Sequence, residues 1–179
     1  MAGTAIVWVA EGTWPASVDA ARTWVPDGDD VVLLHVSGGE IAAAHGALAG
    51  LLGRSRRGPE VGLDALSAEA VAALLERAAQ RLGRPARIEQ RSGRVEREVV
   101  AAADGAAVLI CARDGDRSRL GPRSLGPATR FVVDHVPCPV LLVWPGEAPG
   151  VDSIPPPPLP GAKLPPPPPD APPPPHERR

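Results

Sequence analysis

Apolar residues in the first 144 positions come in short blocks separated by amphipathic stretches. Blocks of strand length lie at residues 5–10, 30–36, 86–90, 106–112 and 139–144. All except 86–90 are almost continuously apolar, which is typical of strands buried on both faces of a parallel sheet. The block at 86–90 reads Ala-Arg-Ile-Glu-Gln and is more polar, so we expect it at an edge of the sheet.

Helical periodicity fills the intervals between these blocks. After Ser67, apolar side chains recur every three or four residues as far as Leu82, so we expect Ser67 to cap this helix and Gly83 to end it. Residues 38–66 give a weaker signal, because glycines interrupt their apolar stretch. Further helices are expected at 15–25, 94–103 and 129–135. The alternation predicts an α/β fold: a five-stranded, parallel, doubly wound sheet with helices on both faces.

The composition changes after Trp144, because most of the 24 prolines lie beyond it, in runs such as Pro-Pro-Pro-Pro-Leu-Pro. Proline lacks a backbone donor and fixes φ, so this region cannot join a sheet or continue a helix. We therefore predict a domain at 1–146 and a disordered Pro-rich tail at 147–179 with polyproline II character. The tail is interpreted as a spacer, and recruitment of a protein partner is the alternative.

Charge and cysteine usage narrow the class of protein. The net charge of −2 argues against a general nucleic-acid or membrane-surface protein. No apolar run approaches a membrane span, and the N-terminus does not resemble a signal peptide, so we expect a cytoplasmic location. Cys111 and Cys138 are interpreted as reduced buried thiols, and the histidines have no ligand-like spacing with them, so no metal site is expected.

The connection after residue 112 is the strongest candidate for chemistry. Residues 113–130 contain five arginines against two aspartates, which leaves three positive charges, and a helix is expected to follow. The free amides at a helix start stabilise an anion, and arginine grips phosphate oxygens. Charge alone therefore nominates Arg113, Arg117 and Arg123 as anion contacts. The alternative is a solvated basic loop whose arginines pair with Asp114, Asp116 and nearby carboxylates.

The chain resembles the universal stress protein family over about residues 4–144. The resemblance rests on Ala-Ile-Val-Trp-Val-Ala-Glu-Gly-Thr near the start, Asp-Val-Val-Leu-Leu-His-Val at 30–36, Ala-Ala-Val-Leu-Ile-Cys-Ala at 106–112 and the ending His-Val-Pro-Cys-Pro-Val-Leu-Leu-Val at 135–143. It implies a five-stranded parallel α/β sandwich. It also implies a homodimer paired through the last strand, here Val140, Leu141, Leu142, Val143 and Trp144.

The ATP-binding motif of that family, G-x2-G-x9-G-[ST], is degenerate here. Ala112 stands for the first glycine, ten residues separate Gly115 from Gly126, and Pro127 replaces the Ser or Thr. Glu11 follows the first strand where family members have an aspartate. The resemblance implies a nucleotide site, and the residues expected to form it together with the three arginines are Glu11, Gly12, Val95, Ala112, Gly115, Gly126, Ala128 and Thr129.

Two functional hypotheses follow. The first is a stress-response regulator that binds ATP or another phosphate-bearing nucleotide, with Mg²⁺ present only if ATP is bound. The second is a dimeric adaptor that binds no nucleotide and recruits a partner through its Pro-rich tail. No catalytic constellation is evident, so we expect no enzyme, or at most slow ATP hydrolysis with Asp114 or Asp116 as a metal ligand.

Overall fold

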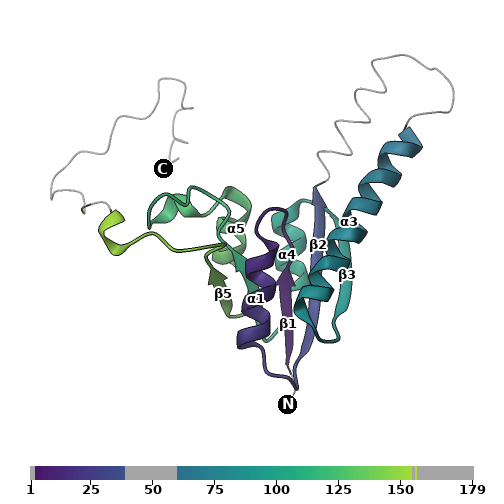
Figure 1. The fold of residues 1–179 in the computed structure, drawn as a ribbon, viewed down its shortest axis with the longest axis horizontal. Coiled ribbons are helices and arrows are strands. Elements are labelled where there is room, and N and C mark those ends of the chain that lie inside the picture. The colour runs from purple at the N-terminus through teal and green to yellow at the C-terminus, as the bar shows by residue number, and fades with distance from the viewer. Residues whose placement is uncertain (1–2, 39–59, 155, 157–179) are drawn as a thin grey trace, which may run out of the picture.

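The computed structural model describes residues 3–38, 60–154 and 156, and for residues 60–67 it describes the backbone only. Five strands form one sheet in the order β3-β2-β1-β4-β5, and all neighbouring pairs are parallel (Figure 1). The strands are β1 (Thr4–Trp8), β2 (Asp30–Gly38), β3 (Arg87–Gly93), β4 (Val108–Ala112) and β5 (Val140–Val143). The predicted five-stranded parallel α/β fold is therefore confirmed.

Helices cover both faces of this sheet. They are α1 (Trp14–Trp24), α3 (Glu60–Leu82), α4 (Val95–Ala102) and α5 (Pro127–His135), with short 3-10 helices η1 (Pro122–Ser124) and η2 (Val151–Ser153). Alternate strand residues face opposite sides. Val7 and Leu33 pack with Leu75 of α3 in one core cluster, whereas Trp8 and Leu34 pack in a second cluster that includes helical residues of α4 and α5.

The boundaries of one helix differ from the expectation. α3 begins at Glu60, so Ser67 lies inside the helix and the prediction that it caps α3 is wrong. Gly83 does follow the last helical residue, with φ +70°, a conformation that glycine adopts without strain. The rest of the uncertain stretch, residues 39–59, lies outside the described residues.

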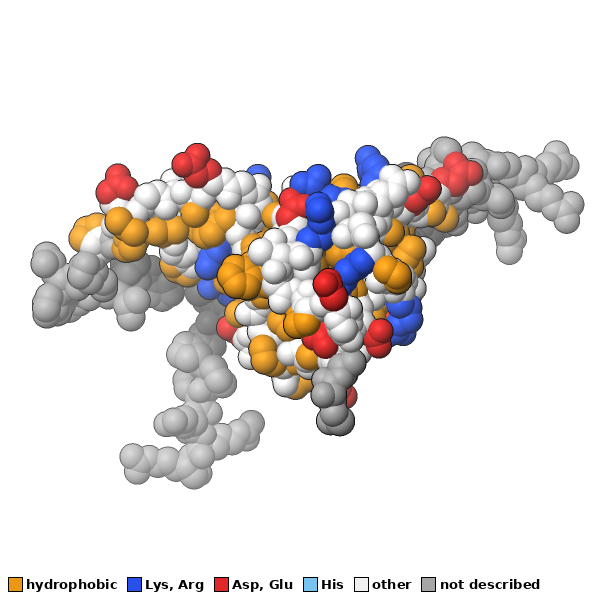
Figure 2. Space-filling view, turned by 60° about the horizontal axis from the view of Figure 1, so that its bottom comes forward, with side chains coloured by type: hydrophobic (Ala, Val, Ile, Leu, Met, Phe, Trp, Pro, Cys, Tyr) orange, Lys and Arg blue, Asp and Glu red, His pale blue; other side chains and the backbone are white. Residues whose placement is uncertain are grey.

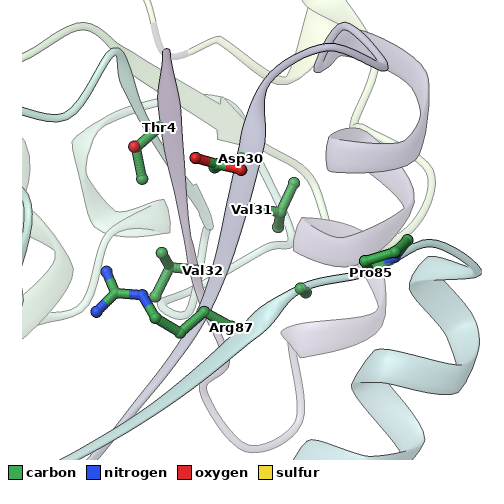
Figure 3. A pocket seen from close by; sticks show the side chains of 7 residues that line it. Thr4, Asp30, Val31, Val32, Pro85 and Arg87 are labelled. Atoms are coloured by element: carbon green, nitrogen blue, oxygen red, sulfur yellow. The ribbon is translucent and has the colours of Figure 1, made fainter. Parts of the chain in front are cut away.

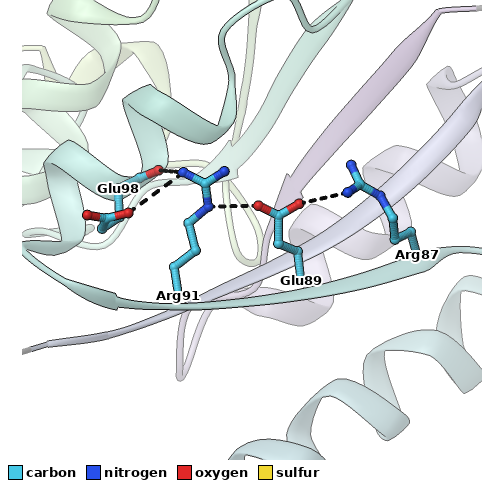
Figure 4. A network of polar contacts seen from close by, with 4 residues as sticks. All are labelled: Arg87, Glu89, Arg91 and Glu98. Carbon is cyan, nitrogen blue, oxygen red and sulfur yellow. Dashed lines mark hydrogen bonds and ion pairs between the residues drawn. The ribbon is translucent and has the colours of Figure 1, made fainter.

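β3 lies at the edge of the sheet, as its polar sequence predicts. Its Glu89 accepts ion pairs from Arg87 (3.2 Å) and Arg91 (2.7 Å), and Arg91 also approaches Glu98 of α4 (3.7 Å). Figure 4 shows these four side chains in one row, which we call the β3 ladder. The ladder places charge along this edge strand, where charged side chains discourage unwanted pairing with another chain.

The chain continues past β5 to a short turn that contacts the rest of the molecule. The hydroxyl Oγ of Ser153 in η2 accepts a hydrogen bond from the Leu120 amide at 3.0 Å. Val151 is 79% exposed and Ile154 is 56% exposed on this extension. The domain boundary at 146 stays a prediction, and residues 157–179 of the expected tail lie outside the described residues.

The surface carries charges of both signs. Figure 2 shows blue and red side chains interspersed on the face that contains the amino end of the sheet, with no single-signed patch there. None of the helices in the described part of the chain is long and apolar enough to cross a membrane. The cytoplasmic location stays a prediction.

Candidate functional site

The candidate site lies at the carboxyl edge of the sheet, between β1 and β4. These two strands pair directly, with Val7 opposite Ile110, although a hundred residues separate them in the chain. From β1 the chain continues on one side to β2, and β4 continues on the other side to β5, so the strand order reverses between them. Ligands of doubly wound sheets bind at this reversal. The connections that follow β1 and β4 therefore leave the sheet side by side.

The connection after β1 is a tight turn that leads into α1. The Ala10 carbonyl accepts hydrogen bonds from the amides of Thr13 (3.3 Å) and Trp14 (2.9 Å). This turn requires φ +76° at Gly12, which only glycine adopts readily, and it leaves both Glu11 and Gly12 exposed. The Glu11 carboxylate and the Gly12 backbone are thus accessible to a ligand.

His35 of β2 forms a hydrogen bond with the backbone directly after β1. Its Nδ1 lies 2.9 Å from the Val9 carbonyl oxygen, and because a carbonyl can only accept, Nδ1 carries the proton. The ring is 8% exposed and is a packed structural group.

Arg113 begins the connection after β4 and is held by three contacts. Its amide donates to the Val143 carbonyl at 2.9 Å, its guanidinium lies 4.8 Å from the ring centroid of Trp144, and its Nη1 donates to Ser124 Oγ. Cation–π stacking and a hydrogen bond to a buried hydroxyl fix the orientation of a planar guanidinium. Arg113 therefore organises the loop, and its side chain is only part-exposed.

The rest of this connection, residues 114–126, folds back on itself. The amides of Gly115 and Asp116 donate to the carbonyls of Ser124 (3.0 Å) and Arg123 (2.8 Å). A Cβ on Gly115 would lie 2.9 Å from the Leu125 carbonyl carbon, closer than real Cβ atoms approach, so this position requires glycine. We call residues 114–126 the closed loop.

The closed loop ends at α5, where Gly126, the third glycine position of the motif, precedes the helix. The Gly126 amide donates to Asp114 Oδ1 at 2.7 Å, and the Asp114 carboxylate lies directly against the Gly126 backbone. Pro127 is the first helical residue, a position where its missing N–H costs nothing. The amides of Ala128 and Thr129 have no intrahelical acceptor at this depth in a helix, although the Thr129 side chain itself is buried.

The remaining arginines divide into two groups. Arg130 of α5 donates to the carbonyls of Pro122 and Leu125 and so helps to hold the closed loop. Arg117 and Arg123 are exposed and Arg119 is part-exposed, and the ion pairs of the described residues lie elsewhere in the fold. Of the predicted carboxylate partners, Asp116 accepts from the Ser118 hydroxyl (2.7 Å) and amide (3.0 Å), which hold the pKa of Asp116 below its usual range.

The predicted site residues thus fall into distinct environments. Glu11, Gly12, Arg117 and Arg123 are exposed at the carboxyl edge, whereas Ala112 is buried at 5% exposure. Val95 begins α4 and lies against Gly38 at the end of β2, beside the same edge. The sequence interpretation missed the roles of Ser124, Trp144 and Asp114 in closing the loop. No local pattern signals these contacts, because each joins residues 11 or more positions apart.

The described part of the chain has two hollows, and one of them borders the closed loop. Figure 3 shows one of about 460 Å³ at the opposite, amino end of the sheet, lined by residues such as Thr4, Asp30 and Arg87. The other, of about 790 Å³, is lined by α5 residues such as Phe131 and by the closed-loop residues Asp116 and Arg123. Among the described residues, no group of three or more His, Cys, Asp or Glu side chains could hold a metal ion.

Comparison with known proteins identifies the family to which this chain belongs. The model of the universal stress protein family matches residues 18–143, which is well over half of the chain. A search of curated proteins by sequence found no match.

Solved structures share the fold at low sequence identity. The structure titled as a structure-based assignment of the function of hypothetical protein MJ0577 gives a TM-score of 0.58 at 17% identity, covering 83% of this chain and 99% of that one. UspA from Lactobacillus plantarum gives 0.53 at 21% identity, covering 78% and 96%. A universal stress protein solved in complex with cAMP gives 0.51 at 18% identity, covering 81% and 98%.

Proposed function

Because the chain belongs to the universal stress protein family, we propose that it is a regulatory protein that binds a nucleotide at the carboxyl edge between β1 and β4. One observation carries this proposal: the connections after β1 and β4 leave neighbouring parallel strands where the strand order reverses. The relative of the same fold that was solved with cAMP supports a nucleotide as the class of ligand.

The exposed groups at this edge suit the parts of a nucleotide. Glu11 is an acceptor for ribose or base donors, and the Gly12 backbone permits close approach. Val95 offers apolar contact on the β2 side. The exposed guanidinium groups of Arg117 and Arg123 supply positive charge for a phosphate.

We favour binding over turnover. Slow ATP hydrolysis would need a carboxylate to hold Mg²⁺, and the two aspartates of this connection already accept hydrogen bonds through Oδ1, Asp114 from the Gly126 amide and Asp116 from Ser118. The adaptor hypothesis has less support, since the nucleotide-bound relative favours the first hypothesis and the Pro-rich residues 157–179 lie outside the described residues.

Native mass spectrometry and thermal denaturation test this proposal together. We expect a nucleotide to co-purify, or an added adenine nucleotide to raise the Tm, and we expect Glu11→Ala to reduce that shift. Glu147→Ala is the matched control, because Glu147 is an exposed glutamate on the extension after β5. If no nucleotide co-purifies and none of ATP, ADP, AMP and cAMP shifts the Tm, the proposal is wrong.

We also propose that the chain forms a homodimer through β5. β5 is the last strand of the sheet order, and each of its residues from Val140 to Val143 is part-exposed. Apolar, part-exposed edge strands pair readily with a second copy.

A further inference from the structure

The N-terminus of α5 already holds an anion, and that anion belongs to the protein. Asp114 Oδ1 accepts the Gly126 amide at 2.7 Å, and both carboxylate oxygens would lie within 3.0 Å of a Cβ built on Gly126. The positive end of a helix dipole stabilises a carboxylate in this position as it would a phosphate. An incoming phosphate group would meet both the volume and the negative charge of Asp114.

Most backbone amides of the closed loop also donate hydrogen bonds within the chain. A loop binds polyphosphate by turning several backbone N–H groups toward the ligand. Here the amides of Gly115, Asp116, Ser118, Leu120, Ser124 and Leu125 all donate to acceptors within the chain. The acceptors are loop carbonyls, the Asp116 carboxylate and Ser153 of η2, so the loop binds itself and the extension after β5.

Two of the arginines that could compensate are engaged as well. Arg113 donates to Ser124 and stacks on Trp144, and Arg130 donates to the carbonyls of Pro122 and Leu125. The donors that stay available near the edge include the amides of Ala128 and Thr129 and the guanidinium groups of Arg117, Arg119 and Arg123. With Asp114 on the Gly126 amide and most loop amides paired, the backbone cradle that a polyphosphate needs is not formed.

We propose that Asp114 is a built-in occupant of the phosphate position at α5, which excludes polyphosphate and selects a nucleotide that carries a single phosphate. This inference rests on the proposed function and narrows its ligand class to nucleoside monophosphates, open or cyclic. Asp114 acts as a specificity-determining residue: a second or third phosphate binds only when its carboxylate leaves Gly126.

Calorimetric titration with AMP and with ATP, each with and without Mg²⁺, tests the inference on the full chain. Wild type is expected to bind AMP at least about tenfold more tightly than ATP. Asp114→Ala is expected to tighten ATP binding by about tenfold or more, the order of magnitude of one charge-assisted contact, and to change AMP binding by less than about threefold. Asp114→Asn keeps the shape and an acceptor, so it separates charge from volume.

Asp116→Asn is the matched control, because it removes the same charge two residues away from a carboxylate bonded to Ser118 rather than to α5. Equal effects of Asp114→Ala and Asp116→Asn on ATP would overturn the inference, since general charge would then explain both. Wild-type binding of ATP as tight as that of AMP would also overturn it.

Inorganic tripolyphosphate distinguishes failure of this inference from failure of the proposed function. If no variant binds either nucleotide, nucleotide binding is wrong, and the thermal shift with tripolyphosphate then decides the role of Asp114. A Tm increase for Asp114→Ala that wild type and Asp116→Asn lack supports an internal occupant, and equal responses refute it. The unliganded Tm of Asp114→Ala should be lower than that of wild type, because the Gly126 amide loses its acceptor.

Discussion

Ser17 and Ser124 are both fully buried, yet their hydroxyl groups are in opposite situations. Ser124 Oγ accepts from Arg113 and donates to the Gly121 carbonyl at 2.7 Å. Ser17 Oγ, in the first turns of α1, has no hydrogen-bond partner among the described residues. A buried hydroxyl without a partner costs free energy, whereas a paired one organises its surroundings.

Alanine substitutions at these two serines should therefore have opposite effects on stability. Ser17→Ala removes the unpaired hydroxyl and improves helix propensity, so we expect the free energy of unfolding to rise by about 0.5–1 kcal/mol. Ser124→Ala leaves Arg113 without its acceptor, so we expect the free energy of unfolding to fall by about 1–3 kcal/mol. Urea unfolding measures both, and a loss of stability in Ser17→Ala would show that its hydroxyl is bonded in solution.

The thiol of Cys111 has the most strongly shifted pKa in the described part of the chain. Burial in the core raises the pKa of its thiol from about 9 to about 12, and the negative charge of Asp114 adds to this rise. The folded state thus keeps a proton that the unfolded state releases above pH 9. Stability from this thiol is present below pH 9 and is lost as the pH rises toward 12.

Alkaline unfolding should report this thiol directly, because the chain has no tyrosine and its single lysine is Lys163. We expect the free energy of unfolding to fall by up to about 1.4 kcal/mol per pH unit between pH 9 and 12. Cys111→Ala should flatten that slope, whatever its effect on stability at neutral pH. Cys138→Ala is the control, since Cys138 is less buried, and an unchanged slope in Cys111→Ala would contradict the assignment.

At the scale of elements, the β3 ladder explains how a polar strand holds its place. β3 pairs with β2 over seven residues, but its own side chains are mostly part-exposed or exposed. Glu89 lies between Arg87 and Arg91 and is the one carboxylate that contacts both (Figure 4). A shared carboxylate in a partly screened position contributes more than an isolated surface pair.

Glu89→Gln should break the ladder at its centre. We expect it to lower the free energy of unfolding by about 1 kcal/mol at low salt, and by less in 1 M NaCl, where ion pairs are screened. Glu76→Gln is the control on the exposed side of α3. The same loss at both salt concentrations would indicate that packing, rather than charge, is responsible.

Elements with strong patterns were predictable, and those defined by long-range contacts were not. β1, β2 and β4 are buried on both faces, so burial alone explains their continuous apolar runs. The predicted start of α3 was wrong because Ser67 has the chemistry of a helix cap. The sequence does not reveal that the helix already begins seven residues earlier, at Glu60. Propensity specifies a helix more reliably than its ends.

At the scale of the whole molecule, the position of the site was predictable from the sequence, but its detailed geometry was not. Parallel topology predicted that the connections after β1 and β4 leave one edge, and the pairing of Val7 with Ile110 confirms it. That Asp114 would reach the Gly126 amide could not be predicted, because the loop must first close through Ser124 and Gly115. Such closure depends on non-local geometry, for which the sequence carries no periodic signal.

The free side of β5 is where a second copy would add to the sheet. The Pro139 and Val143 carbonyls accept hydrogen bonds from Leu109 and Arg113 on the β4 side, both at 2.9 Å. Backbone groups of successive strand residues point to opposite sides, so the amides of Val140 and Leu142 face away from β4. A partner strand at β5 would use these amides.

Leu142→Pro should therefore abolish the proposed dimer while leaving the β4–β5 hydrogen bonds intact. Proline removes the outward amide and is tolerated on edge strands. Leu142→Ala removes more side chain but keeps the amide, so it should remain dimeric and serves as the matched control. Light scattering after size exclusion measures both masses, and circular dichroism confirms that each variant is folded. A folded Leu142→Pro variant with the mass of the wild-type dimer would place the subunit interface elsewhere, because proline at 142 removes one of the two outward amides that the partner strand would use.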